Sequence, residues 1–373
     1  MSEGARHRAG RAAGEGGLRI LLISNMWPGD SDPVFGIFVS RHVRALEEAG
    51  ASVRVVANHD PRTGPLRTPL KYVGLLVRSL AAAVSGPYDV AVGHFLYPTA
   101  AIASVAARIA HAPYVVVAHG TDVRSLERPS RIGRMCRTAV QGADARVAVS
   151  GVLAERLRAA AGLPQDSPVE VVHMGIDTSV FGPDRNARSS LGIPEVERVV
   201  LFAGKLVPVK GVDVLLRAFA ALREAGEADR LVIVGDGPLA GVLRDEARAL
   251  GCEADVRFVG QVTQPELASW MAAADVFVLP SHDEGRGLVL LEAMACGTPC
   301  VASAVGGIPE TLPPECGRLV PPAEPAALAD AIREVLGAGA ASFAQACIDH
   351  ADTQNVNGQA ERFLSITERV VRR

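Results

Sequence analysis

Short apolar runs alternate with amphipathic stretches along almost the whole chain of 373 residues. The apolar runs lack the period-two alternation of half-exposed strands, so they predict strands that are buried on both faces. Strands that alternate with helices predict a parallel, doubly wound α/β sheet. The predicted strands are 18–24, 53–57, 90–92, 114–118, 146–149, 170–172, 199–203, 231–234, 256–259, 276–279, 300–302 and 318–320.

One segment, residues 181–198, interrupts this alternation because it is rich in residues that form turns, namely Gly182, Pro183, Asp184, Asn186, Ser189 and Pro194. We therefore predict an N-terminal domain over residues 18–188 and a C-terminal domain over residues 189–352. Residues 353–373 predict a last helix that packs back on the N-terminal domain. Residues 1–17 are rich in Gly, Ala and Arg without an apolar run, so we expect a disordered tail and no signal peptide.

The composition narrows the classes of function. Hydrophobic residues make up 49% and charged residues 21% of the chain, which suits two buried cores. Aromatic residues are only 4% and the net charge is -3, so neither base stacking nor a basic field points to nucleic acid. The six cysteines form no Cys-x-x-Cys pair, which predicts reduced thiols in a cytoplasmic protein and no zinc site. No apolar run is long enough to predict a membrane span.

A glycine-flanked loop after the predicted strand 199–203 carries two of the three lysines in the chain. Lys205 and Lys210 lie between Gly204 and Gly211, and a helix is predicted to begin directly after Gly211. Free amides at the start of a helix favour anions, and two ammonium groups beside them suit a diphosphate. Two solvated loop lysines are the ordinary alternative.

Residues 282–299 carry the strongest signal in the chain. They follow a predicted strand, and two glycines, Gly285 and Gly287, precede an apolar helical run that a Gly-x-Pro sequence ends. Amides near Gly287 and Leu288 would then lie at a helix start, where they can bind phosphate oxygens.

Two carboxylates flank this predicted helix start. Glu284 lies in the loop, and Glu292 lies one to two turns into the helix. A carboxylate accepts several hydrogen bonds and donates none, which suits the hydroxyls of a ribose on one side and of a transferred sugar on the other. Glu292 interrupts an apolar run, where a buried carboxylate without a partner would cost roughly several kcal/mol. A glutamate on the wet face of an ordinary helix is the alternative.

These residues resemble the signature of family 4 retaining glycosyltransferases with the GT-B fold. The setting Glu-Gly-x-Gly-Leu-x-Leu-Leu-Glu-Ala-Met-Ala-Cys-Gly-x-Pro spans residues 284–299, and residues 204–211 resemble the phosphate-clamp loop of the family. Further family segments match, in the expected order, residues 234–238, 258–262 and 305–310. The resemblance implies two facing Rossmann-like, doubly wound parallel-sheet domains with a cleft between them, and it adds Val262 to the donor-binding residues.

The amino-terminal half resembles the family more loosely. Residues 27–39 are similar to the first loop of members that build cell-surface polysaccharides, the teichuronic-acid branch, and Gly36 would bring backbone near the donor phosphates. Residues 118–122 match a His-Gly-x-Asp segment. The resemblance implies that His119 reaches the transferred sugar and shares the catalytic role with Glu284. Acceptor contacts are expected from His94, Tyr97 and Asp122.

The chain departs from the family pattern at three places. Lys205 stands where Arg is commoner, which keeps the charge and loses bidentate geometry. Arg286 stands where an aromatic residue often sits, so sugar specificity does not carry over directly. His173 and Met174 replace Pro and Asn in a turn that we interpret as a domain connection.

The resemblance implies a retaining glycosyltransferase that moves a hexose or related sugar from a UDP- or GDP-linked donor to a hydroxyl acceptor. The acceptor would be a lipid-linked glycan or a small molecule, in the synthesis of a surface polysaccharide or glycolipid. Lys205, Lys210 and the helix amides would stabilise the leaving diphosphate, so we expect neither a metal ion nor a cofactor. Glu284 would position the donor sugar and would not act as a nucleophile.

Other functions stay open at this point. They are a glycosyltransferase of a small natural product, a GT-B nucleotide-sugar epimerase and a non-catalytic sugar-nucleotide-binding subunit. A phosphorylase would need a lysine for pyridoxal phosphate, and both loop lysines are already assigned to the diphosphate. A dinucleotide oxidoreductase is disfavoured because no Gly-x-Gly-x-x-Gly follows the first predicted strand.

Residues 66–84 mix apolar side chains with Arg67, Lys71 and Arg78. The pattern is typical of a packed helix with a charged face, and it also suits a basic amphipathic surface that rests on a membrane. We therefore expect a cytoplasmic protein, with peripheral contact at the inner face of the membrane as the second interpretation.

Overall fold

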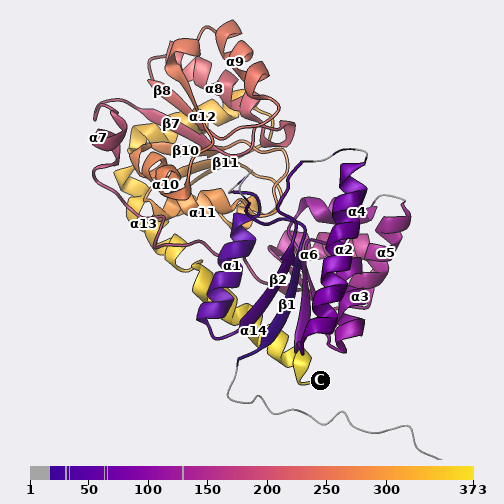
Figure 1. Ribbon diagram of the computed structural model, residues 1–373. Helices are drawn as coiled ribbons and strands as arrows, with labels where there is room; N and C mark the ends of the chain where they lie inside the picture. The colour runs from indigo at the N-terminus through magenta and orange to yellow at the C-terminus, as the bar shows by residue number, and fades with distance from the viewer. Residues whose placement is uncertain (1–16, 30–31, 33, 63, 65, 128–129) are drawn as a thin grey trace, which may run out of the picture. The chain divides into compact units, whose positions relative to one another are not determined.

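The chain divides into two compact units, which Figure 1 shows with their helices and strands labelled. The computed structural model describes residues 17–29, 32, 34–62, 64, 66–127 and 130–373. Unit 1 comprises the described residues up to Ala148 together with 154–172 and 357–373, and unit 2 comprises 149–153 and 173–356. Of the predicted tail 1–17, all but Gly17 lies outside the described residues.

Unit 1 is built on a parallel six-stranded sheet in the order β2-β1-β3-β4-β5-β6. Every residue of β3 is buried, and every residue of β1 and β4 except the first, as their continuous apolar runs predict. The strands are β1 (Arg19–Ser24), β2 (Ser52–Ala57), β3 (Val90–His94), β4 (Tyr114–Ala118), β5 (Ala145–Ala148) and β6 (Glu170–Val171).

The helices of unit 1 alternate with these strands. Helix α3 packs against both α2 and α5, so the three form one layer (Figure 1). Helix α6 begins with residues of unit 2 and continues in unit 1. The helices are α1 (Ile37–Glu48), α2 (Arg67–Ser85), α3 (Thr99–Ala110), α4 (Thr121–Glu127), α5 (Arg131–Gln141), α6 (Gly151–Ala161) and the last helix, α14 (Val356–Val371).

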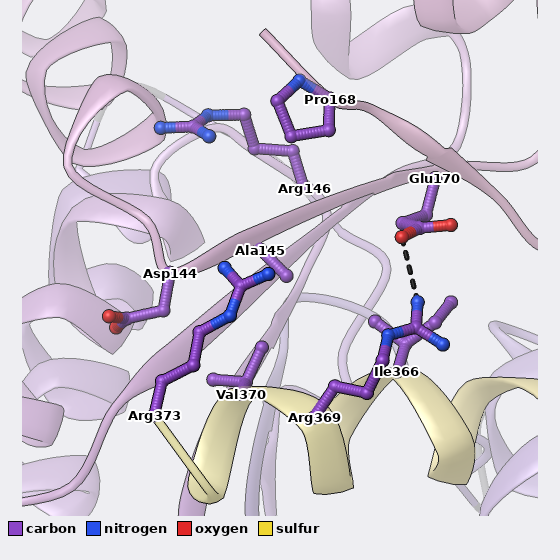
Figure 2. Close-up of a pocket in the computed structure, with 9 residues that line it drawn as sticks. All are labelled: Asp144, Ala145, Arg146, Pro168, Glu170, Ile366, Arg369, Val370 and Arg373. Carbon is purple, nitrogen blue, oxygen red and sulfur yellow. Dashed lines mark hydrogen bonds and ion pairs between the residues drawn. The ribbon is translucent and has the colours of Figure 1, made fainter.

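Helix α14 belongs to unit 1 from Asn357 onward. Its Phe363 lies edge-on to His42 of α1, with ring centroids 5.0 Å apart. Its Arg369 pairs with Glu170 at the start of β6, at 2.8 Å. Figure 2 shows this ion pair beside a pocket that α14 lines together with the amino ends of β5 and β6. Because ligands of open parallel sheets bind at the carboxyl ends of the strands, this pocket lies at the wrong edge for the predicted site.

Unit 2 repeats the architecture with a parallel sheet in the order β12-β11-β10-β7-β8-β9. β7, β10 and β11 are buried throughout. The strands are β7 (Val199–Ala203), β8 (Arg230–Val234), β9 (Val256–Gly260), β10 (Val276–Leu279), β11 (Cys300–Ser303) and β12 (Gly317–Val320). The α-helices are α7 (Ala187–Leu191), α8 (Val212–Glu224), α9 (Ala240–Ala249), α10 (Gln264–Ala273), α11 (Leu288–Ala295), α12 (Pro325–Ala338) and α13 (Ala341–Asp352). Short 3₁₀ turns are η1 (Pro208–Lys210), η2 (Glu253–Asp255), η3 (Ile308–Glu310) and η4 (Pro314–Cys316).

The division between the units falls earlier in the chain than the boundary predicted at residues 188 and 189. The turn-rich segment does interrupt the strand pattern, but its apolar residues Phe181, Ala187 and Ile193 are buried in the core of unit 2. The chain passes from unit 1 to unit 2 at Val172, where β6 has just ended. The turn-rich segment is therefore part of unit 2. The chain leaves unit 1 at Val172, before this segment begins.

Every predicted strand overlaps an observed strand, with ends that differ by no more than two residues. The strand orders then locate the candidate sites. In unit 2 the order reverses between β7 and β10, and in unit 1 it reverses between β1 and β3. Ligands of doubly wound sheets bind at such reversal points, outside the carboxyl ends of the strands.

Candidate active site

The loops that follow β7 and β10 meet at the reversal point of unit 2. Lys210 ends the 3₁₀ turn η1, and its Nζ lies 2.5 Å from Oε2 of Glu284 in the loop after β10. Both side chains are partly exposed, at 22% and 18%, so the pair is sheltered yet open to a ligand. The backbone amide of His282 also donates to the carbonyl of Val209, at 2.8 Å. The structure thus brings together two residues that the sequence assigned to one site.

Gly211 makes this junction possible. Its φ is 62°, in the left-handed region that favours glycine, and it starts helix α8. A Cβ at this position would lie 2.2 Å from the carbonyl oxygen of Pro280. Any other residue would therefore push the loop of Lys210 away from the loop of Glu284.

The other glycine motifs of unit 2 hold neighbouring loops in direct backbone contact. A Cβ at Gly235, after β8, would lie 2.0 Å from the carbonyl oxygen of Gly204, after β7. A Cβ at Gly306, after β11, would lie 1.8 Å from the carbonyl oxygen of Glu284, which also accepts the amide of Gly307 at 3.2 Å. These glycines allow the loops after β7, β8, β10 and β11 to pack closely against one another at one edge of the sheet.

Helix α11 starts at the same edge. Gly287, with φ 80°, is its N-cap, and Leu288 is its first residue. The free amides of this first turn point away from the helix body. Gly285 lies two residues before the N-cap, Gly287. Glu292 is only 9% exposed, so it does not lie on a wet helix face. The helix ends at Ala295, and Gly297 follows with φ 84°, as the Gly-x-Pro stop predicts.

The remaining donor residues take different positions. Lys205 follows β7 in the same loop as Lys210 and is exposed. Val262 follows β9, which is the edge strand of the sheet, and packs against the core of unit 2. Gly36 belongs to unit 1, where it is the left-handed N-cap of α1, with φ 73°. A Cβ there would lie 2.7 Å from the carbonyl carbon of Met26, so the first loop of unit 1 also needs glycine.

The carboxyl edge of the sheet in unit 1 carries a cluster of three histidines. His94 ends β3, His119 follows β4, and His42 lies on α1. His94 Nδ1 and His119 Nε2 are 3.0 Å apart, and the ring centroids of His42 and His94 are 5.7 Å apart. His119 also packs against the rings of Phe38 and Phe95.

Burial keeps this cluster neutral. It lowers the pKa of His42 to about 4, and together with His42 it lowers the pKa of His119 to about 3. The pKa of His94 is also lowered well below its usual value, by burial first and then by the two neighbouring rings. At neutral pH all three imidazoles are therefore uncharged hydrogen-bonding groups.

The bond between His94 and His119 couples their tautomers, because one ring nitrogen must donate and the other accept. If His94 Nδ1 donates, His119 presents a donating Nδ1–H to a ligand. If His119 Nε2 donates, its Nδ1 becomes an acceptor. In either tautomer the bond with His94 engages Nε2 of His119 and leaves Nδ1 as the other ring nitrogen.

Asp122 and Tyr97 lie near these histidines in the chain but differ in role. The Asp122 carboxylate is buried and accepts the amides of Leu96, His119 and Gly120, at 3.0, 3.1 and 2.7 Å. It therefore holds the loops after β3 and β4, and burial raises its pKa against the effect of these hydrogen bonds. Tyr97 is half-buried after β3, and its carbonyl oxygen lies 3.4 Å from Nδ2 of Asn25.

Comparison with known proteins gives this geometry a family. Residues 36–180 match the model described as Glycosyltransferase Family 4, and residues 183–352 match the model described as Glycosyl transferases group 1. The chain belongs to glycosyltransferase family 4. The two matches divide near residue 180, and both reach the candidate residues of their halves.

Curated relatives of this family 4 chain fall into two kinds. A D-inositol 3-phosphate glycosyltransferase of Mycolicibacterium gilvum (strain PYR-GCK) is 40% identical over 50% of the chain and 43% of its own length. The putative teichuronic acid biosynthesis glycosyltransferase TuaC of Bacillus subtilis (strain 168) is 27% identical over 84% of the chain and 88% of its own length. The chain spans less than half the length of the inositol-phosphate relatives that it matches first.

Solved structures establish the fold. HepE of Anabaena, solved in complex with UDP, has a TM-score of 0.75 at 22% identity, over 94% of this chain and all of HepE. A structure of HepE with UDP-glucose has a TM-score of 0.72. The predicted GT-B fold class, with a doubly wound parallel sheet in each of two units, is confirmed.

Two departures from the family 4 pattern lie in contact. Arg286, where an aromatic residue is common, is only 4% exposed, and its Nη1 contacts Nδ1 of His173. Its Nη2 donates to Oε1 of Gln354 at 2.8 Å, and its Nη1 lies 3.5 Å from the carbonyl oxygen of Val149. Burial lowers the pKa of Arg286 to about 10, against the attraction of Glu310, so the side chain stays charged at neutral pH. Arg286 thus anchors the loop after β10 inside unit 2.

Sequence reasoning missed several residues that shape this family 4 site. His42 completes the histidine cluster, and no motif in the sequence around it identifies it as a site residue. Glu310 accepts the amides of Gly151 and Val152 at the start of α6, each at 2.8 Å. Ser150 donates to the carbonyl of Gly285 at 3.0 Å. These contacts join segments far apart in the chain, and a motif search along the sequence does not detect them.

Three further findings bear on the predictions. Within the described part of the chain, no helix is long and apolar enough to cross a membrane. All six cysteines are free and buried. Among the described residues no group of three or more His, Cys, Asp or Glu is placed to hold a metal ion. The sequence does contain one Asp-x-Asp triplet, at residues 30–32, of which only Asp32 is described.

Proposed function

We propose that this chain transfers a hexose or related sugar from a nucleoside diphosphate sugar to a hydroxyl acceptor, with retention of anomeric configuration. The observation that carries the proposal is the Lys210–Glu284 pair at the reversal point of the unit 2 sheet. The start of helix α11 lies three residues further along the same loop. A cation, a carboxylate and free helix amides are the groups that a sugar diphosphate needs.

The diphosphate is the leaving group, so its negative charge must be stabilised as the glycosidic bond breaks. Lys210 and the amides of Gly287 and Leu288 supply positive potential, and the exposed Lys205 adds a second ammonium group from the same loop. These groups carry the charge without a metal ion. Transfer that persists in excess EDTA supports this part of the proposal, and transfer that needs added Mg²⁺ or Mn²⁺ contradicts it.

Glu284 positions the transferred sugar. Its ion pair with Lys210 leaves the carboxylate able to accept hydroxyls while its charge is compensated. Glu292, buried within the first turns of α11, is assigned to the ribose hydroxyls. His119 donates to or accepts from the sugar through Nδ1, as a neutral imidazole. For retention, the acceptor attacks the face that the diphosphate leaves, and the leaving phosphate takes the acceptor proton.

The relatives support a donor and an acceptor class. HepE has been solved with UDP and with UDP-glucose, so a UDP-linked hexose is the first donor to test. TuaC, which aligns with most of this chain, is named for teichuronic acid biosynthesis. We therefore assign the acceptor to a lipid-linked glycan of a surface polysaccharide, with a small-molecule hydroxyl as the second candidate because D-inositol 3-phosphate glycosyltransferases are also among the relatives. Six free thiols favour reaction on the cytoplasmic side.

A thermal-shift panel of UDP- and GDP-linked sugars tests the donor. A ligand that binds only the folded protein adds roughly 2.7 kcal/mol of stability at 100 times its Kd, so a matched donor raises the melting temperature. The donor that binds is then incubated with and without acceptor extracts. Transfer only in the presence of acceptor supports the proposal, and isomerised donor without acceptor would establish an epimerase.

Matched variants connect this binding to the site. Glu284→Gln should lower the transfer rate by more than tenfold, and Glu195→Gln, at an exposed loop position of the same unit, should leave it unchanged. A Glu284→Gln rate within a few-fold of wild type contradicts the positioning role. Donor binding without transfer to any acceptor extract would indicate a non-catalytic sugar-nucleotide-binding subunit.

A further inference from the structure

Helix α2 carries apolar side chains on two opposite sides. Its buried side, which includes Leu75 and Ala82, packs into unit 1. Its other side exposes Leu70, Val73 and Val77 at 70%, 56% and 59%. These positions are three and four residues apart, so they form one stripe along the helix. Leu66 and Val84 extend the stripe at its two ends, at 79% and 76% exposure.

The neighbouring helices also expose apolar side chains. Helix α3 packs against α2, and α5 packs against α3 (Figure 1). Ile109 of α3 is exposed at 38%, and Ile132 and Met135 of α5 are exposed at 44% and 59%. In the described part of the chain, nine of the sixteen large apolar side chains that are exposed lie on α2, α3 and α5 or on the residue that caps α2. We call the exposed side of these three helices the α2–α3–α5 surface.

The charges on this surface have one sign. Helices α2, α3 and α5 contain seven Arg and Lys residues and no Asp or Glu, in a chain that has 41 acidic residues. Arg67 on α2, Arg108 on α3, and Arg131 and Arg134 on α5 are all exposed. Helix α9 of unit 2, by contrast, has Arg244 and Arg248 beside Asp245 and Glu246.

We propose that the α2–α3–α5 surface binds an anionic lipid bilayer. Exposed apolar residues flanked by Lys and Arg are the features of surfaces that lie in a membrane interface, with apolar groups at the acyl boundary and cations at the headgroups. Large apolar side chains that are exposed together on neighbouring helices are typical of interaction surfaces. A second copy of the chain fits less well, because a symmetric contact would bring the exposed arginines of both copies together without an acidic partner.

The position of the surface suits the proposed reaction. Helices α2 and α3 are the next elements along the chain after β2 and β3, so their amino ends lie toward the carboxyl edge of the sheet that carries His94 and His119. A bilayer on this surface would bring a lipid-linked acceptor to that edge. The lipid contact itself does not depend on the transfer reaction, because it uses none of the donor or histidine residues.

Vesicle flotation tests the proposal with the full chain and without any donor. One set of vesicles contains equal parts phosphatidylglycerol and phosphatidylcholine, and the other contains phosphatidylcholine alone. The charge of the surface predicts that the protein binds the anionic vesicles about tenfold more tightly or better, and that high salt weakens the binding. No binding to anionic vesicles at low salt, or equal binding to both sets, would overturn the proposal.

Two pairs of variants separate the contributions. Leu70→Ser with Val77→Ser removes apolar contact, and Arg131→Ala with Arg134→Ala removes charge. Arg131→Ala with Arg134→Ala should weaken binding to the anionic vesicles by about 15-fold to 35-fold, since each exposed Arg or Lys near an anionic surface contributes about a fourfold to sixfold change. Leu70→Ser with Val77→Ser should weaken it by about tenfold, because it removes two apolar contacts with the acyl boundary. The control pair is Val196→Ser with Val242→Ser, at valines of unit 2 that are exposed at 89% and 60%. Control binding that falls as much as in the test pairs would contradict the assignment to this surface.

Two measurements keep the outcomes distinct. All pairs should keep the wild-type melting temperature, because the substituted side chains are exposed. Sedimentation equilibrium should show a monomer at vesicle-assay concentrations, whereas a dimer that Leu70→Ser with Val77→Ser dissociates would assign the surface to a second copy and overturn the lipid proposal. A donor that raises the melting temperature of the Leu70→Ser, Val77→Ser protein as in wild type shows that failure at the lipid surface leaves the proposed donor site intact.

Discussion

The carboxyl edges of the two sheets present opposite chemistry. At the edge of unit 2, a lysine and a glutamate form a sheltered ion pair beside a helix start. At the edge of unit 1, three imidazoles are packed together, and burial lowers their pKa values until they are neutral. The same parallel sheet thus supports a charged site in one unit and an uncharged hydrogen-bonding site in the other.

The difference follows from what each edge would bind. A diphosphate needs positive potential, which exposed or sheltered lysines and helix amides provide. A sugar hydroxyl needs donors and acceptors at fixed angles, which neutral imidazoles provide without attracting the diphosphate to the wrong unit. Substitutions at one edge should therefore leave the chemistry of the other edge unchanged.

The largest effect is expected at the charged edge. Lys210→Met removes the cation nearest to Glu284 and leaves that carboxylate without its ion-pair partner. We expect transfer to fall about 10²–10³-fold, the usual loss for one preorganised charge-stabilising group. Lys205→Met, which removes an exposed ammonium from the same loop, should cost about tenfold or less. Equal losses for the two lysines in steady-state assays would contradict the geometry.

The neutral edge should make the stability of unit 1 depend on pH. His42 has a pKa of about 4 in the folded chain and about 6.5 unfolded, so below pH 6.5 the unfolded chain binds the extra proton. Stability is therefore complete above pH 6.5 and falls as the pH drops, by about 2 kcal/mol at pH 5 for this residue. His94, lowered for the same reason, acts in the same direction.

Unfolding in urea at pH 7 and pH 5 measures this loss. His42→Phe should flatten the dependence, because the aromatic ring fills the space beside Phe363 without a titrating nitrogen. His111→Asn, at an exposed position that ends α3, is the control and should behave like wild type. A His42→Phe protein that loses as much stability as wild type between pH 7 and pH 5 rules out His42 as a cause of the loss.

A smaller effect is expected from the hydrogen bond between His94 and His119. His94→Phe removes the partner that fixes the His119 tautomer, and kcat should fall by about tenfold while KM for the donor changes little. His94→Asn keeps a polar atom near the position of Nδ1 and should restore part of the rate. Nitrogen chemical shifts of His119 report the tautomer directly, and an unchanged spectrum in His94→Phe would refute the coupling.

The smallest effect is expected at the two departures from the family pattern. Arg286 and His173 touch, so their substitutions should not be additive. A double-mutant cycle with Arg286→Met and His173→Ala should give a coupling free energy of about 1 kcal/mol in unfolding. Additive effects would mean that the contact between Arg286 and His173 contributes nothing to the free energy of unfolding.

The two edges also differ in how far the sequence predicts them. In unit 2 the site residues lie in short loops between strands that are easily recognised, and glycines at fixed positions identify those loops. Gly211, Gly235 and Gly306 are required because a Cβ would meet a neighbouring carbonyl. Glycines at these positions in the sequence therefore indicate where the loops pack together. That is why Lys210 and Glu284 could be assigned to one site before their contact was known.

The site of unit 1 depends on contacts that no local pattern records. His42, His94 and His119 come from α1, β3 and the loop after β4, and they meet only because the sheet order places β1, β3 and β4 together. Asp122, which is expected at the acceptor, also binds three backbone amides, and no local pattern predicts those contacts. The boundary at residue 188 was displaced for a related reason, since composition shows where turns lie and not which core buries Phe181.

The central claim is that Lys210 binds the diphosphate while Glu284 holds the transferred sugar, and calorimetric titration of UDP tests it most directly. UDP has a diphosphate and no transferred sugar, so the two residues should separate. Glu284→Gln should bind UDP within a few-fold of wild type although its transfer rate falls by more than tenfold, and Lys210→Met should lose affinity for UDP by about tenfold or more. UDP affinity that is lost in Glu284→Gln and kept in Lys210→Met would contradict the account.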